Sequence, residues 1–235
     1  MRFKGLQKLT LLDYPGMVAC TLFTGGCNFR CPFCQNASLV LPDHRSEDIP
    51  EEEVYDFLKK RVGILDGVAL TGGEPLLEPD IKDFLRAVKA MGYRIKLDTN
   101  GTSPDLLAEI ISEGLIDRVA MDIKSSPANY ARVTGVPRPP MERIEKSMKI
   151  LMEGTLPFEF RTTVVRGLHD EEDLLSLAKW IAGDEEYYLQ QYRDSGDLIA
   201  PDGLSAYSDE EMLHFASMMK PYVPCAQARG ITNTI

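Results

Sequence analysis

The stretch Gly25-Gly26-Cys27-Asn28-Phe29-Arg30-Cys31-Pro32-Phe33-Cys34-Gln35-Asn36 decides how this sequence is interpreted. Three of the five cysteines lie in it with the spacing C-x3-C-x2-C, directly after an apolar run typical of a strand. Thiolates are ligands that iron–sulfur clusters and zinc prefer. A closed structural zinc site uses four protein ligands, and no fourth Cys or His lies nearby in the sequence. We therefore expect three cysteines to hold a cluster and leave one iron open to a small molecule.

The composition limits the class of protein and its partners. The 235 residues are 44% hydrophobic, which is enough for a substantial core, and α/β barrels of this length commonly form one unit. The formal net charge of −10 argues against nucleic acid or an anionic membrane as the main partner. The N-terminus lacks the apolar core of a signal peptide, and no apolar run has the length of a membrane span. The clustered, odd-numbered cysteines do not form a disulfide framework. We expect a cytoplasmic protein.

Outward from the cysteine stretch, apolar runs alternate with segments of helical periodicity. We expect strands over 17–24, 67–71, 93–98, 118–124, 158–165 and 186–192. Helices are expected to begin near Pro50, Ile81, Ser103, Met141, Glu171 and Asp209, with Ser103 and Ser208 as N-caps. About six parallel β/α units follow from this alternation, fewer than the eight of a full barrel. We expect one domain over 1–235, with a short strand or lead-in and a hairpin-like turn over 1–16, a β/α core over 17–220 and a tail over 221–235 that adds a short strand.

Polar residues follow the expected strands at the points where the strands end. In parallel β/α architectures, ligands bind at the carboxyl ends of the strands. The cysteine stretch follows the first strand, and the others end in Gly72-Gly73-Glu74-Pro75, Asp98-Thr99-Asn100-Gly101, Asp122 with Lys124, Arg161, and Gln190-Gln191-Tyr192. The sequence therefore predicts that these groups converge on one mouth.

Each of these features also has a purely structural interpretation. The cysteines could form a zinc knob, and Gly72 to Pro75 could be an ordinary turn. Asp98 could cap a helix or end a solvated strand. Asp122 and Lys124 alternate along a strand and so could form a salt bridge on one face, while Arg161 could pair with a carboxylate at the edge of the core. His44, His169 and His214 are scattered, and none has a Ser or Cys partner in local sequence.

Two motifs in this order resemble the radical S-adenosylmethionine (SAM) enzymes: the C-x3-C-x2-C stretch with an aromatic before its last cysteine, and Gly72-Gly73-Glu74-Pro75. Asp98-Thr99-Asn100-Gly101 and Met121-Asp122-Ile123-Lys124 resemble segments of the activating enzymes of glycyl-radical enzymes. The opening Gly5-Leu6-Gln7-Lys8-Leu9, Asp13-Tyr14-Pro15-Gly16 and the closing Ala228-Arg229-Gly230 resemble the branch that activates anaerobic ribonucleoside-triphosphate reductase. The resemblance covers essentially the whole chain.

The resemblance implies a partial (β/α)6 barrel of the radical SAM type and a set of cofactor-binding residues. It implies that Cys27, Cys31 and Cys34 ligate three irons of a [4Fe-4S] cluster, whose fourth iron SAM chelates. Phe33 would lie near the adenine, Gly72 and Gly73 would admit the methionine part, and Glu74 would bind its ammonium. The remaining SAM-contacting positions would be Asp98, Asp122, Lys124 and Arg161. The resemblance also implies a monovalent cation bound near Asp98 and Asp122.

The resemblance also implies the reaction and its partners. A one-electron donor such as flavodoxin or ferredoxin would reduce the cluster, which cleaves SAM to methionine and a 5′-deoxyadenosyl radical. That radical would remove a hydrogen atom from a backbone glycine of the partner enzyme, and no side chain of this chain need act as acid or base. The chemistry belongs to the cofactor, and the protein positions and shields it.

Other functions stay open at this point. Where some pyruvate formate-lyase activases carry a histidine on the sixth strand, this chain has Gln190-Gln191-Tyr192-Arg193, which leaves the partner undecided. The chain could activate another glycyl-radical enzyme, or act on a small molecule as a radical SAM enzyme of the 7-carboxy-7-deazaguanine synthase type. A third interpretation is a noncatalytic module whose cysteines hold zinc or an electron-transfer cluster.

Overall fold

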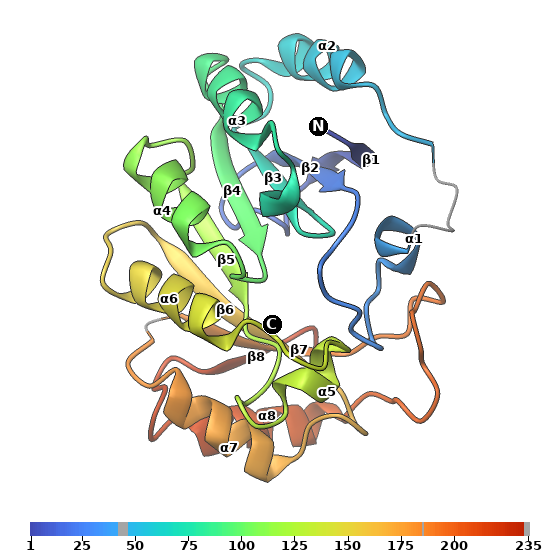
Figure 1. Cartoon of the computed structure of the whole chain (residues 1–235), viewed down its shortest axis with the longest axis vertical. Helices are drawn as coiled ribbons and strands as arrows, with labels where there is room; N and C mark the ends of the chain where they lie inside the picture. Colours follow the sequence, from blue (N-terminus) through green and yellow to red (C-terminus); the bar gives the residue numbers. More distant parts are fainter. Residues whose placement is uncertain (42–46, 185, 233–235) are drawn as a thin grey trace. The chain divides into compact units, whose positions relative to one another are not determined.

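The computed structural model describes residues 1–41, 47–184 and 186–232 (Figure 1). These residues form two compact units. Unit 1 contains residues 1–28, 36–120 and 143–157, and unit 2 contains residues 29–35, 121–142 and 158–235 apart from those outside the described ranges. Eight strands, β1 to β8, follow one another in the sheet in chain order. His44 lies outside the described residues.

Four strands build the sheet of unit 1. They are β1 (Phe3–Thr10), β2 (Ala19–Thr24), β3 (Gly67–Gly72) and β4 (Arg94–Thr99). The strand β1 runs antiparallel to β2, whereas β2, β3 and β4 are parallel, and β2 pairs with β3 without interruption from Ala19↔Gly67 to Thr24↔Gly72. The central strands are apolar along most of their length and buried on both faces, as expected for parallel strands. Their carboxyl ends therefore lie at one edge of this unit's sheet.

Helices follow the strands of unit 1 in the order that the sequence predicts. They are α1 (Ala37–Val40), α2 (Glu51–Arg61), the short 3-10 helix η1 (Pro75–Leu77), α3 (Ile81–Ala90), α4 (Pro104–Ser112) and α6 (Met141–Met152), of which the first two residues belong to unit 2. Helix α3 packs against β4 (Figure 1), and its Phe84, Leu85 and Val88 are buried. Helix α2 has three acidic residues in its first turn and three basic residues in its last, which complements the helix dipole.

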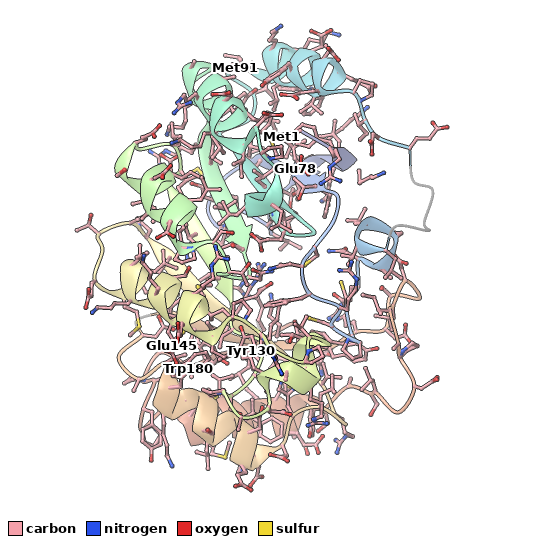
Figure 2. All side chains as sticks on the ribbon, in the orientation of Figure 1. Met1, Glu78, Met91, Tyr130, Glu145 and Trp180 are labelled. Carbon is pink, nitrogen blue, oxygen red and sulfur yellow. The ribbon has the colours of Figure 1, made fainter. Side chains whose placement is uncertain are left out.

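Three parallel strands and three helices make up most of unit 2. They are β6 (Phe158–Val164), β7 (Tyr187–Gln191), β8 (Gln227–Arg229), α5 (Tyr130–Thr134), α7 (Glu171–Trp180) and α8 (Asp209–Met219). The strand β5 (Arg118–Asp122) contributes residues to both units. Helices α7 and α8 pack side by side (Figure 1). Figure 2 labels Tyr130, which is buried, and the half-buried Trp180. Their ring centroids are 6.0 Å apart in an edge-to-face arrangement.

The predicted alternation of strands and helices is confirmed, and the differences are local. The strand expected from Met17 begins at Ala19, and the strand expected through Lys124 ends at Asp122. The lead-in contains the long strand β1, and the tail contains the short strand β8. The short helices α1 and α5 were not expected, because four or five residues are too few to show a period. Among the described residues, no helix is long and apolar enough to cross a membrane.

Candidate functional site

The cysteine stretch leaves β2 and is held in unit 2 by its backbone. Arg30 N donates to Thr134 O at 2.8 Å, and Ala200 N donates to Pro32 O at 2.9 Å. A bond of 3.0 Å from Cys34 N to Cys31 O closes a turn between these two cysteines. Gly135, with φ of +67°, lies so close that a Cβ there would meet Arg30 O at 2.3 Å. These contacts fix the course of the loop that carries Cys31 and Cys34.

The three thiols differ in burial and in surroundings. Cys31 is buried, whereas Cys27 and Cys34 are half-buried. In unit 1, Cys27 Sγ lies 3.9 Å from both Asn100 Nδ2 and Asn28 Oδ1. Among the described residues, no three His, Cys, Asp or Glu side chains are already gathered as a metal site. Three thiols within eight positions of one loop nevertheless form the donor set that an iron–sulfur cluster takes.

Two glycines, Gly72 at the end of β3 and Gly73 directly after it, allow two backbone segments of unit 1 to touch. A Cβ on Gly72, which has φ of +112°, would lie 2.4 Å from Thr24 N, and one on Gly73 would lie 1.8 Å from Gly26 O. Glu74 N donates to Gly26 O at 2.8 Å, and Asn36 Nδ2 donates to Gly72 O at 3.1 Å. The glycine pair is therefore more than a turn, because it lets the end of β3 lie against the start of the cysteine stretch.

Glu74 is 1% exposed and joins the ends of β3 and β4. Its Oε1 accepts from Thr99 Oγ1 at 2.7 Å and from Leu76 N at 3.2 Å, and its Oε2 accepts from Asn100 N at 2.7 Å. A buried carboxylate needs such donors to offset its lost hydration. Within unit 1, the structure therefore brings together two of the predicted strand-end motifs through one side chain.

Three further polar residues of unit 1 connect the cysteine stretch to the end of β4. Asn100 Nδ2 donates to Asn28 Oδ1 at 2.8 Å, and Asn28 Nδ2 donates to Thr102 Oγ1 at 2.9 Å. Asn28 and Thr102 were not singled out from the sequence. The only feature of the sequence that points to these two residues is that each lies next to a motif: Asn28 follows Cys27, and Thr102 follows Asn100-Gly101.

Asp98 pairs with a buried lysine that sequence reasoning missed. Lys96 is 2% exposed, and its Nζ lies 2.6 Å from Asp98 Oδ1. The two residues alternate along β4, so both side chains leave the same face of the strand. The sequence signal for this pair is the spacing of a lysine two positions before an aspartate, with the apolar residues Ile95 and Leu97 beside them in the strand.

Asp122, Lys124 and Arg161 form one ion-pair group in unit 2. Lys124 Nζ lies 2.9 Å from Asp122 Oδ2, and Arg161 Nε donates to Asp122 Oδ1. Burial alone would raise the pKa of Asp122, but the charges of Arg161 and Lys124 outweigh it and hold this pKa below its ordinary value. Burial likewise opposes charge on Lys124, yet Asp122 and then Cys31 raise the pKa of its ammonium. All three groups are therefore charged at neutral pH.

Phe33 packs against a histidine that the sequence left unassigned. Phe33 is buried, and its ring lies 6.4 Å from that of His169 in an edge-to-face arrangement. Val165 N donates to His169 Nδ1 at 3.1 Å, so Nε2 carries the hydrogen that faces Lys124 O at 2.9 Å. His169 thus joins the ends of β5 and β6 to the cysteine stretch, and it does so as a neutral ring.

The polar side chains at the end of β7 form hydrogen bonds within unit 2 and do not present an obvious ligand group. Gln191 Nε2 donates to Tyr207 O and to Asp209 Oδ1, both at 2.9 Å. Arg193 donates to Gly230 O, and its own carbonyl accepts from Gln35 Nε2. Within each unit the strand-end residues therefore gather, around Glu74 and Asn100 in unit 1 and around Asp122 in unit 2. Convergence of all of them on one mouth stays a prediction.

This fold and donor set define the class of the protein, and comparison with known families agrees. The chain belongs to the radical SAM superfamily, whose family model matches residues 21–181, a range that includes every predicted site residue. Membership implies an enzyme with a [4Fe-4S] cluster and SAM. The chemistry of the three thiols fits that cluster.

Among curated relatives, a protein of Methanocaldococcus jannaschii matches over nearly the whole chain. It is named provisionally as a glycyl-radical enzyme activating enzyme, and it is 31% identical over 239 residues, covering 98% of this chain and 96% of that protein. A GTP 3′,8-cyclase of Thermococcus kodakarensis, named as probable, is 34% identical over 153 residues. This second match covers 63% of the chain and only 48% of the cyclase.

Solved structures share the fold. A domain of pyruvate-formate lyase-activating enzyme from Bacteroides vulgatus has a TM-score of 0.57 at 22% identity, covering 70% of this chain and 99% of that domain. SuiB of Streptococcus suis has a TM-score of 0.69 at 16% identity, covering 89% of this chain and 48% of SuiB. At such low identities these likenesses establish the radical SAM fold alone, and they confirm the predicted fold class.

Proposed function

We propose that this protein is the activating enzyme of a glycyl-radical enzyme. The observation that carries the proposal is the match to the M. jannaschii protein, at 31% identity over 98% of this chain. The match to the cyclase is confined to 63% of the chain. A relative that aligns from end to end supports transfer of an activity better than one that shares only part of the chain.

The proposal assigns the cofactors to the predicted residues. Three thiolates hold the [4Fe-4S] cluster, and eight residues hold SAM: Cys27, Cys31 and Cys34 for the cluster, and Phe33, Gly72, Gly73, Glu74, Asp98, Asp122, Lys124 and Arg161 for SAM. When bound, these cofactors supply the reductive cleavage of SAM that yields a carbon-centred radical. The chain's own residues position the cofactors and exclude water.

Three observations support this assignment of SAM contacts. Glu74 and Asn100 are held to each other, which fixes a buried carboxylate for an ammonium group. The group of Asp122, Lys124 and Arg161 carries a net positive charge in unit 2, suited to a carboxylate. Phe33 offers an aromatic face or edge next to the cysteines, which suits a nucleobase.

We further propose that the partner is anaerobic ribonucleoside-triphosphate reductase, with flavodoxin or ferredoxin as electron donor in the cytoplasm. The motifs at both ends of the chain, Asp13-Tyr14-Pro15-Gly16 and Ala228-Arg229-Gly230, favour this partner over pyruvate formate-lyase.

A radical SAM enzyme that acts on a small molecule is the second candidate. The 34% identity to the GTP 3′,8-cyclase over 153 residues favours it. The two candidates share SAM cleavage and differ in what loses the hydrogen atom. GTP, SAM and reductant without a partner protein therefore provide the control incubation in the test below.

The first test measures SAM cleavage. Anaerobically reconstituted protein with SAM and dithionite should release 5′-deoxyadenosine, and Cys31→Ala should lose both the cluster iron and this activity. Cys225→Ala is the matched control, since Cys225 lies on the chain's tail and its Sγ donates to Asp184 O. No 5′-deoxyadenosine from the intact protein would refute radical SAM chemistry, and full cleavage by Cys31→Ala would refute the ligand assignment.

The second test identifies the partner by electron paramagnetic resonance. A glycyl-radical doublet should appear on anaerobic ribonucleoside-triphosphate reductase only when this protein, SAM and reductant are all present. Pyruvate formate-lyase is incubated in parallel under the same conditions. A doublet on pyruvate formate-lyase alone would overturn the proposed partner, and conversion of GTP in the control incubation would favour the second candidate.

A further inference from the structure

Lys96 is a buried cation at the candidate site that the proposed function leaves without a role. It is 2% exposed, although lysine is almost never fully buried unless it is paired. Its ammonium lies 2.6 Å from Asp98 Oδ1, within the range of a charge-assisted hydrogen bond. Removal of an ammonium from water is costly, so a lysine kept in this position calls for a specific reason.

The strand register explains how a long polar side chain fits there. Lys96 pairs in register with Ala69 on β3, and Ala69 pairs with Thr21 on β2. These neighbours are small, whereas the next positions along the strands are Leu97, Leu70 and Leu22. Side chains in register lie on the same face of a parallel sheet. The row of small residues therefore leaves space for the lysine stem, which directs the ammonium toward Asp98.

The same arrangement recurs in unit 2. Asp122 has its own lysine two positions away, with Lys124 Nζ at 2.9 Å, and Arg161 adds a second positive charge. Each aspartate to which the resemblance assigns a monovalent cation is therefore already paired with a cationic side chain on its own strand or directly after it. A further cation at either carboxylate would lie close to like charge, which is unfavourable.

We propose that Lys96 is a positioning residue whose ammonium takes the place of an alkali cation at Asp98. The carboxylate is then held by a tethered, directional donor with three hydrogens instead of a diffusible ion. The inference rests on the proposed function for its ligand, SAM. It predicts that this protein binds SAM without a requirement for sodium or potassium.

The first measurement is SAM binding to the reconstituted protein without reductant, by equilibrium dialysis under anaerobic conditions. Binding is compared in potassium chloride, sodium chloride and choline chloride at equal ionic strength. The three dissociation constants should agree within about twofold. A specific interaction with the alkali cation would change the dissociation constant by about tenfold. Binding that is about tenfold tighter in potassium or sodium chloride would overturn the inference.

The second measurement uses Lys96→Met, which keeps most of the stem and removes the charge. SAM binding to this variant in choline chloride should weaken by about tenfold or more, and potassium or sodium should restore part of the loss. Lys149→Met is the matched control, because Lys149 is exposed on α6. SAM binding to Lys96→Met that equals the intact protein in choline chloride would overturn the inference.

A double variant protects the test against misfolding. Lys96→Met leaves a buried carboxylate without this partner, whereas Lys96→Met/Asp98→Asn removes both charges and should regain stability. If Lys96→Met does not fold, the comparison of cations on the intact protein still decides the inference. Failure of the proposed function is separate, because it appears as absent 5′-deoxyadenosine in every salt, whereas this inference depends on the ratio of SAM affinities between salts.

Discussion

At the scale of single residues, the candidate site depends on close backbone approach and on side chains paired over long sequence distances. Glu74 bonds to Asn100, 26 positions away, and Gly73 lies against Gly26. A glycine pair followed by Glu-Pro is compatible with an ordinary turn when only the sequence is known. The structure shows a physical requirement for glycine that a turn alone would not impose.

Substitution of Gly73 tests this requirement. Gly73→Ala should destabilise the protein by about 3 kcal/mol, because its Cβ would overlap Gly26 O at 1.8 Å and the backbone must move. Gly92→Ala is the control: Gly92 has φ of +92° with nothing within 4 Å, so strain alone should cost about 1 kcal/mol. Urea unfolding of both variants measures the difference. Equal losses would show that the close approach is not the cause.

His169 should make stability depend on pH in a defined direction. Burial lowers its pKa below the ordinary 6.5, although the Lys124 carbonyl and Asp173 oppose this and Arg132 supports it. Below pH 6.5 the unfolded chain takes up a proton that the folded ring resists. The stabilising contribution is therefore complete above this pH and is lost as pH falls, by at most about 1.4 kcal/mol per pH unit.

The corresponding measurement is the free energy of unfolding of apo-protein between pH 7 and 5, in steps chosen to resolve this loss. His169→Gln should be less stable than the intact protein at neutral pH, and the gap should narrow as the pH falls. His214→Gln serves as the control, since His214 is exposed and pairs with Glu171. Parallel pH curves for the intact protein and His169→Gln would contradict the prediction.

At the scale of elements, the sequence predicted which helices and strands form, and in what order, better than it predicted the geometry at the helix ends. Ser208 and Ser103 were both expected to cap helices. Ser208 does so in a full capping box, since Glu211 N donates to its Oγ and Glu211 Oε2 accepts from Ser208 N. Ser103 stands at the N-cap of α4 without a capping side-chain bond. Residue type alone does not fix the rotamer that a cap requires.

The two serines give a matched pair of variants. Ser208→Ala should cost about 1 kcal/mol of stability, because it leaves a helix donor without its side-chain acceptor. Ser103→Ala should cost at most a few tenths of a kcal/mol, because no such bond is lost. Urea unfolding followed by circular dichroism compares them. A larger loss for Ser103→Ala would contradict the assigned cap geometry.

At the scale of the whole molecule, composition and alternation were enough to predict the architecture. Six of the strands lie within two residues of the expected ranges, because buried parallel strands are continuous apolar runs and helices have a 3.6-residue period. The antiparallel strand β1 is longer than the short strand or lead-in expected there, since its exposed Gln7, Lys8 and Leu9 break the apolar pattern. An edge strand of this kind resembles a loop in sequence.

The sequence by itself determined the superfamily, the strand–helix order and the residues at the strand ends. These depend on neighbours in the chain: the cysteine spacing, the Gly-Gly-Glu-Pro motif and hydrophobic periodicity. Only the tertiary structure decided which of those residues pair. Lys96 holds Asp98, Glu74 holds Asn100, and Arg161 holds Asp122. The physical reason is that strand register and rotamer, set by packing across the whole sheet, decide which charges meet, and neither is encoded in local pattern.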